Sequence, residues 1–145
     1  MLGGVSGAQL NLGANPDWAW FGWNGVVDLN VSVTHKLSVD GKFAVLVKDF
    51  EAFGAAVIGK QYTAVGFDNV PGTVVNCTIS VNMSTVATRL KVGDDMACGA
   101  ETSGTFVINV VPSMMAGAPP VPDPVQIHSG TWTFQDAGQQ KLRTR

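Results

Sequence analysis

The sequence is poor in charged residues. Asp, Glu, Lys and Arg make up 14% of its 145 residues, well below the share of about a quarter that is usual in globular chains. The formal net charge is −2, so the chain lacks the basic surface that binds nucleic-acid phosphates. Little charge combined with much Val, Thr and Gly is typical of a tightly packed β structure, or of a surface that partners cover. We therefore expect no nucleic-acid partner.

Long apolar runs are also missing. No stretch reaches the ~20 residues that a membrane-spanning helix needs. Residues 1–12 lack the basic start and the sustained apolar run of a secretory signal. These two absences predict a protein that is cytoplasmic until it joins any larger assembly.

Recognisable catalytic motifs are absent as well. The sequence has no glycine-flanked serine elbow, no phosphate-binding loop and no dinucleotide fingerprint. Its carboxylates are scattered, and most of them lie at predicted turns, where aspartate is favoured for backbone reasons. We therefore predict a protein without enzymatic activity. An enzyme would need polar groups that only the fold brings together, such as His128 beside Asp123.

Histidine and cysteine are scarce, with two of each. Two histidines and two cysteines can form a tetrahedral zinc shell, and by residue type the candidates are His35, Cys77, Cys98 and His128. The closely spaced ligand pairs of typical zinc sites are missing, so only the fold could bring the four together. The alternatives are two buried thiols with two histidines on surface strands, or a Cys77–Cys98 disulfide. The residues leave these three interpretations open.

What the sequence does contain is a short segment that occurs twice. Residues 34–44 (THKLSVDGKFA) and 87–97 (ATRLKVGDDMA) both run base, leucine, any residue, valine, two turn residues, a further residue, a hydrophobe and alanine. Internal repeats decide architecture, and Asp-Gly between alternating residues is a strong hairpin signal. The repeat therefore predicts two related β-hairpins, which turn at residues 40–41 and 93–94.

Alternation of apolar and polar residues predicts the other strands. In residues 74–81, it places Val75, Cys77, Ile79 and Val81 on one buried face. The predicted strands outside the two hairpins are residues 26–33, 74–81, 105–111, 125–134 and 139–143.

The remaining segments predict little regular structure. Residues 51–58 are rich in alanine and can form one or two helical turns, whereas residues 112–124 form a Pro-rich loop that is extended or turn-like. We predict a single all-β domain over residues 1–145. It should be a compact, hairpin-rich cone or sandwich with a Pro-rich loop and at most one short helix.

Three of the four tryptophans lie in the Gly-rich N-terminal segment, residues 1–25. Strand alternation would place Trp18 and Trp20 on one face of an extended segment. Such an aromatic cluster either packs against the core or offers a surface for a partner or a sugar. We treat four residues as a candidate docking surface: Trp18, Trp20, Phe21 and Trp23.

Three short motifs resemble a known family. They are KLSVDGKFA at residues 36–44, VPGT at 70–73 and AGQQKLR at 137–143, and they are similar to the hairpin, turn and closing strand of PAAR-like proteins. Members of that family are small β-rich cones, and many hold a structural zinc near the apex. The family's Asp-Pro-Thr and His-Gly-Gly segments are missing here. Only residue type therefore makes His128 and Cys98 candidate ligands for one structural zinc, the single cofactor that the resemblance implies.

The resemblance implies a non-enzymatic structural component of a contractile injection particle, such as a type VI secretion system or a phage tail. The protein would cap the trimeric spike and sharpen the membrane-piercing tip. Its partners would be the trimeric spike protein and effector or toxin domains, and it would meet the target membrane only on injection. It would be cytoplasmic before assembly, and delivered or virion-associated afterwards.

Two alternatives rank below this interpretation and also fit the composition. One is a phage-type decoration or tail-tube structural protein, which is also Gly-rich, β-dominated and poor in catalytic groups. The other is a β-sandwich carbohydrate-binding module that uses the tryptophan cluster to stack sugars.

Overall fold

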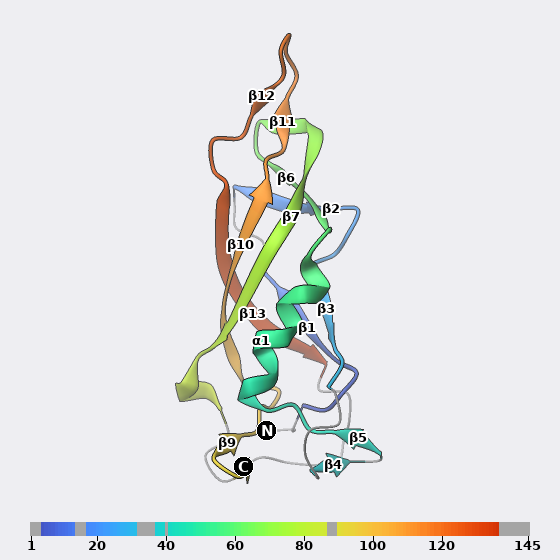
Figure 1. The fold of residues 1–145 in the computed structure, drawn as a ribbon, viewed down its shortest axis with the longest axis vertical. Coiled ribbons are helices and arrows are strands. Elements are labelled where there is room, and N and C mark those ends of the chain that lie inside the picture. The colour runs from blue at the N-terminus through green and yellow to red at the C-terminus, as the bar shows by residue number, and fades with distance from the viewer. Residues whose placement is uncertain (1–3, 14–16, 32–36, 40, 87–89, 137–145) are drawn as a thin grey trace.

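A computed structural model describes residues 4–13, 17–31, 37–39, 41–86 and 90–136. The chain forms a curled, half-barrel β-sheet with one short helical segment of 11 residues (Figure 1). The prediction of an all-β fold with at most one short helix is confirmed.

The strands follow one another along the chain as β1 Ala8–Leu12, β2 Trp18–Phe21, β3 Val26–Leu29, β4 Ser38–Val39, β5 Lys42–Phe43, β6 Gln61–Ala64, β7 Phe67–Val81, β8 Lys91–Val92, β9 Asp95–Met96, β10 Ser103–Val111, β11 Met114–Met115, β12 Val121–Pro122 and β13 Ile127–Asp136. The helical segment consists of α1, Phe50–Phe53, between 3₁₀ turns at Val47–Asp49 and Gly54–Val57. A third 3₁₀ turn spans Met83–Thr85.

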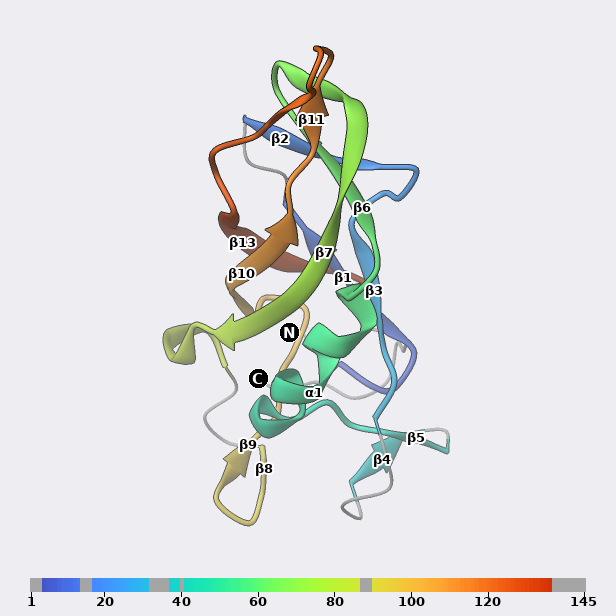
Figure 2. The ribbon, with the colours of Figure 1, turned by 45° about the horizontal axis from the view of Figure 1, so that its top comes forward.

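The main sheet has the strand order β12-β11-β7-β10-β13-β1-β3, and β6 joins it by pairing with β7, while β2 pairs with β6. All of these neighbours are antiparallel. The long strands β7, β10 and β13 form its centre, and α1 lies against the concave side of this region (Figure 2). Strands β1 and β6 were not predicted. Both alternate polar and apolar residues, but they are only five and four residues long.

The concave side of the sheet holds an aromatic core. Trp132 of β13 is fully buried and stacks on Phe50 of α1, with ring centroids 4.8 Å apart. Its indole Nε1–H donates a 2.8 Å hydrogen bond to the carbonyl of Ser80 in β7. This bond crosses β10 at Gly104, the residue paired with both Trp132 and Val81. Because Gly104 has no side chain, the Trp132 indole can pass over β10 from β13 to β7.

One residue of β7 faces the opposite way from the prediction. Val75 is 48% exposed, whereas Val74 is buried, and Cys77 and Ile79 are buried as predicted. The pairing of β7 with β10 shifts by one residue at this point, because a β-bulge leaves Val75 unpaired between Val74 and Asn76. A bulge interrupts the two-residue period of a strand, so strict alternation predicts the wrong face beyond it.

The two repeated segments form the two predicted hairpins. β4 pairs with β5, and β8 pairs with β9, in the same register. In the first hairpin the N–H of Ala44 donates to the carbonyl of Leu37. In the second hairpin the N–H of Ala97 donates to the carbonyl of Leu90, and both bonds are 2.9 Å long. The sequence repeat is therefore a structural repeat.

Beyond the hairpins, three distant segments close a ring of backbone hydrogen bonds. The N–H of Val45 donates to the carbonyl of Gly4 (2.8 Å). The N–H of Gly4 donates to the carbonyl of Cys98 (2.8 Å), and the N–H of Cys98 donates to the carbonyl of Val45 (2.9 Å). Each segment thus donates to one neighbour and accepts from the other. We call these three residues the base ring, because they lie toward the same end of the molecule as the two hairpins.

The molecule is elongated, and its two ends differ (Figures 1 and 2). The hairpins β4–β5 and β8–β9 project at the broad end, whereas β11 and β12 form the narrow one. Residues 112–124 were predicted to be a loop, but they contain these two short paired strands, and Met114 also pairs with Val70 of β7. The predicted strand at residues 139–143 lies outside the described residues. Among the residues that are described, no helix has the length and apolar character to cross a membrane.

We expect Gly104→Ala to lower the free energy of unfolding by about 1–3 kcal/mol, or more, because the core cannot expand around it. A methyl group there would collide with the Ser80 carbonyl and lie 2.7 Å from Trp132 Nε1, displacing the indole from its hydrogen bond. Urea denaturation measures the change. Thr105→Ala, on the exposed face of the same strand, is the control and should cost less.

Candidate functional site

The fold separates the residues predicted to bind zinc. Cys77 in β7 and His128 in β13 both pair with Ile108 of β10, so Ile108 lies between them on the concave face. Two strand spacings put their Cα atoms about 9–10 Å apart. Cys98 belongs to the base ring, and His35 lies outside the described residues. Within the described part of the chain, no group of three or more His, Cys, Asp or Glu side chains is placed to hold a metal.

Both cysteines are buried free thiols, so the alternative of a Cys77–Cys98 disulfide is not present in this structure. Burial raises the pKa of the Cys77 thiol to about 11. Burial also raises the pKa of Cys98, and the negative charges of Asp49 and Asp95 raise it further. Metal binding and nucleophilic chemistry need the thiolate, so both thiols have the character of inert core residues.

The raised thiol pKa makes a prediction about alkaline pH. The Cys77 thiol has an ordinary pKa of 9.0 when unfolded and a pKa of about 11 in the native protein. Between these pH values the unfolded chain binds fewer protons, so the free energy of unfolding should fall as the pH rises. Urea denaturation from pH 8 to 11 should show a smaller fall for Cys77→Ala than for the wild type. Equal slopes would contradict the assigned pKa.

The predicted aromatic docking surface packs largely into the core. Trp18 is 2% exposed and contacts Trp20 edge to face, with ring centroids 4.3 Å apart. The indole N–H groups of Trp20 and Trp23 donate to backbone carbonyls of Leu12 and Val26, at 3.2 and 3.1 Å. Phe21, on the opposite face of β2, is 50% exposed. Trp18 is therefore a core residue, Trp20 and Trp23 are partly buried against the core, and Phe21 is the most exposed of the four. A docking role for this cluster stays a prediction.

We expect Trp20→Ala to lower the free energy of unfolding by about 3 kcal/mol, because it removes an indole packed against Trp18 and Phe106. Phe21→Ala should cost less than about 1 kcal/mol, since half of that side chain is already in water. Chemical denaturation of the two variants measures the difference. Equal losses would mean that Trp20 does not belong to the core.

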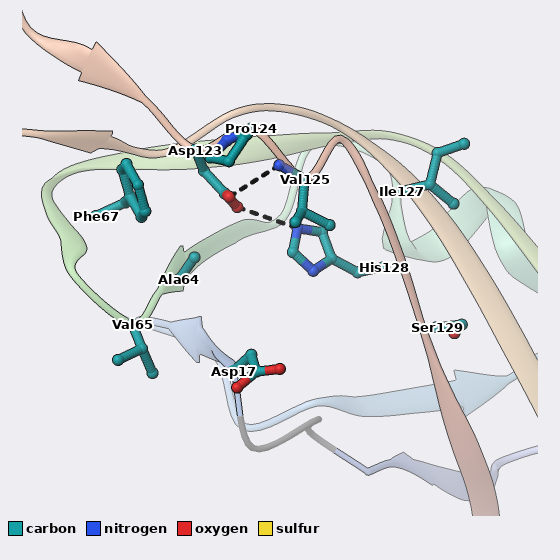
Figure 3. Close-up of a pocket in the computed structure, with 10 residues that line it drawn as sticks. All are labelled: Asp17, Ala64, Val65, Phe67, Asp123, Pro124, Val125, Ile127, His128 and Ser129. Atoms are coloured by element: carbon teal, nitrogen blue, oxygen red, sulfur yellow. Dashed lines mark hydrogen bonds and ion pairs between the residues drawn. The ribbon is translucent and has the colours of Figure 1, made fainter.

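The described residues also form a cleft (Figure 3). Its lining comes in part from the segments around β6 and β12, which lie in the narrow half of the molecule (Figure 1). Its volume is about 410 Å³. The floor is polar and the walls are mostly apolar, and the lining residues are Asp17, Ala64, Val65, Phe67, Asp123, Pro124, Val125, Ile127, His128 and Ser129.

At the floor of the cleft, His128 of β13 lies beside Asp123, which follows β12 (Figure 3). His128 Nε2 and Asp123 Oδ2 are 3.4 Å apart, and the two side chains are only 6% and 4% exposed. Among the described residues, neither atom has a hydrogen-bond partner. The sequence suggested this pair only as an example of what the fold could bring together, and its one signal was an aspartate in the Pro-rich segment shortly before a strand histidine.

Both members of the pair are held in place by their surroundings. The Asp123 Oδ1 atom accepts a 2.9 Å hydrogen bond from the N–H of Val125, and its own N–H donates to the carbonyl of Ser113. The His128 ring stacks on Trp18 at 5.3 Å and contacts Tyr62 at 5.1 Å. The two polar atoms therefore form a rigid, buried pair that can hold a proton or a cation.

Comparison with known proteins adds no relative, since no protein-family model matches the sequence and no curated protein matches it either.

Proposed function

We propose that this protein is a non-enzymatic structural component of a contractile injection particle, where it caps the trimeric spike and sharpens the membrane-piercing tip. The observation that carries the proposal is the base ring with its two repeated hairpins. The family resemblance of the sequence motifs adds to it independently.

The base ring gives the broad end a three-fold hydrogen-bond pattern. The segments at Gly4, Val45 and Cys98 each make one donor bond and one acceptor bond to the other two. The segments at Val45 and Cys98 directly follow the two hairpins that share a register. A single chain that repeats one local arrangement about an axis can match the end of a trimer, whose three copies present the same surface about the same axis.

The opposite end has the properties of a tip. The β11–β12 hairpin narrows the molecule (Figure 1), and residues 112–122 contain no charged side chain. Four prolines in this stretch, Pro112, Pro119, Pro120 and Pro122, restrict the backbone. An uncharged, stiff and narrow end is suited to entering a membrane, because burial of a charge in a bilayer is costly.

The structure gives less support to a carbohydrate-binding module. Sugar-binding aromatic residues present a free ring face, whereas Trp18 is buried and Trp20 packs edge to face with both Trp18 and Trp23. We therefore place the partner surface at the base hairpins. The spike protein is the proposed partner there, with effector or toxin domains as further cargo.

The proposal predicts a complex of one copy with one spike trimer. Native mass spectrometry should show this 1:3 complex with a trimeric spike protein from the same genome. The double variant Lys42→Glu/Lys91→Glu reverses an exposed charge on each hairpin, and we expect it to weaken binding at least tenfold. Phe21→Ala is the matched control on the aromatic cluster and should bind as the wild type does.

The other outcomes separate the alternatives. Weakened binding in Phe21→Ala alone would move the docking surface to the aromatic cluster. A ring-sized homo-oligomer that does not bind the spike would favour a decoration or tail-tube protein. Failure of the wild type to bind any spike trimer from that genome would overturn the proposal.

A further inference from the structure

Asp123 places a carboxylate at the floor of the cleft, almost out of contact with water. Its side chain is only 4% exposed, and among the described residues its Oδ2 atom has no hydrogen-bond partner. The group that faces Oδ2 is the ring of His128, and imidazole is largely uncharged at neutral pH. A charge removed from water is costly unless an opposite charge lies close by. The floor of the cleft therefore favours a cation.

Asp123 also determines what His128 offers to a ligand. A neutral imidazole carries its one proton on either nitrogen, and the group that faces one nitrogen selects the tautomer. The carboxylate beside Nε2 selects the form with an Nε2–H group, which leaves a lone pair on Nδ1. Figure 3 shows that this second ring nitrogen points into the cleft, toward Asp17. His128 thus presents a hydrogen-bond acceptor, and the ligand must supply the donor.

Asp17 supplies a second carboxylate, across the cleft from His128 (Figure 3). Its backbone carbonyl accepts a 3.0 Å hydrogen bond from the N–H of Val65, which fixes the residue beside β6. Asp17 and Asp123 are the acidic residues of the described lining, and none of the described lining residues is Lys or Arg. A cleft lined by charges of one sign attracts ligands of the opposite sign. Both acceptors and charges thus select a cationic donor.

The rest of the cleft is apolar and much larger than a small ion. Its volume is about 410 Å³, whereas one water molecule takes up about 30 Å³ of the liquid. Val65, Phe67 and Ile127 contribute to its walls. Val65 is 71% exposed and Ile127 is 63% exposed, so a ligand could still cover much of their surface. Apolar walls around a few convergent polar groups are typical of sites for organic ligands. The cation should therefore carry an apolar stem.

We propose that this cleft binds a primary ammonium group on an apolar stem, either in a free alkylamine or in the lysine side chain of a protein partner. An ammonium group has three diverging donors, so it can donate to His128 Nδ1 and to Asp17 on opposite walls. The flat guanidinium of arginine instead matches the two oxygens of one carboxylate. The proposal does not depend on the spike-capping function, since the lining contains no residue of the base hairpins.

NMR titration of the full-length chain with n-hexylammonium tests the proposal. The sequence has two histidines, so the variant His35→Gln identifies the imidazole resonances of His128, which should shift on binding. We expect n-hexanol, which has the same stem without the charge, to bind at least tenfold more weakly. Nα-acetyl-lysine N-methylamide presents the ammonium group as a peptide does. Affinity equal to that of n-hexylammonium would support a partner's lysine as the ligand, and lower affinity would support a free amine.

Two variants test the carboxylates. Asp17→Asn and Asp123→Asn each remove a charge and keep the shape of the side chain, and each should weaken the binding of n-hexylammonium at least tenfold. Asp17 is exposed, so that variant should fold even if Asp123→Asn does not. Asp94→Asn, the same change at an exposed turn, should bind as the wild type does. Wild-type affinity in Asp17→Asn, equal binding of n-hexanol, tighter binding of n-pentylguanidinium, or no binding of n-hexylammonium would overturn the proposal.

Discussion

The base ring is the constraint on which the arrangement of this protein depends. Its three hydrogen bonds join Gly4, Val45 and Cys98, which are far apart in the sequence. Two isolated β-bridges, Val5 with Ala44 and Leu46 with Ala97, extend the same contacts on either side. Because all the donors and acceptors are backbone groups, side chains can vary while the ring persists. The ring thus sets where both hairpins leave the body and where the helical segment after Val45 begins.

The curled sheet creates the second requirement, which is large side chains on its concave face. Trp132, Phe106 and Tyr62 fill that face and are fully buried. The polar atoms of Trp132 and Tyr62 need partners there. The Trp132 indole N–H donates to the Ser80 carbonyl, and the Tyr62 hydroxyl accepts from the N–H of Ser113. The aromatic core therefore links the central strands to the segment that precedes the narrow end.

The cleft lies where this aromatic core meets the Pro-rich segment. His128 is fixed by aromatic rings from β2 and β6, whereas Asp123 is fixed by backbone bonds of the segment between β12 and β13. The site is thus assembled from separate parts of the chain, each with its own structural reason for being there.

Local patterns allowed much of the fold to be predicted. The hairpins at 38–43 and 91–96 follow from adjacent turn and strand residues, and the helical turns within 50–57 match the alanine-rich run at 51–58. The 3₁₀ turn at Val47–Asp49 lies outside that run and was not predicted. The face of Val75 could not be predicted, because the bulge arises from the pairing of β7 with β10. The paired strands within 112–124 escaped prediction for a similar reason, since Met114 also needs Val70 of β7 as a partner.

By itself, the sequence determined the all-β class, the repeated hairpins and the scarcity of charge, because these depend on residues close together in the chain. Tertiary structure alone decided that Trp18 is core, that Cys77 and His128 are separated by Ile108, and that His128 lies 3.4 Å from Asp123. The physical reason is that strand register and sheet curvature place side chains from distant segments. Neither property is encoded in any single stretch of alternating residues.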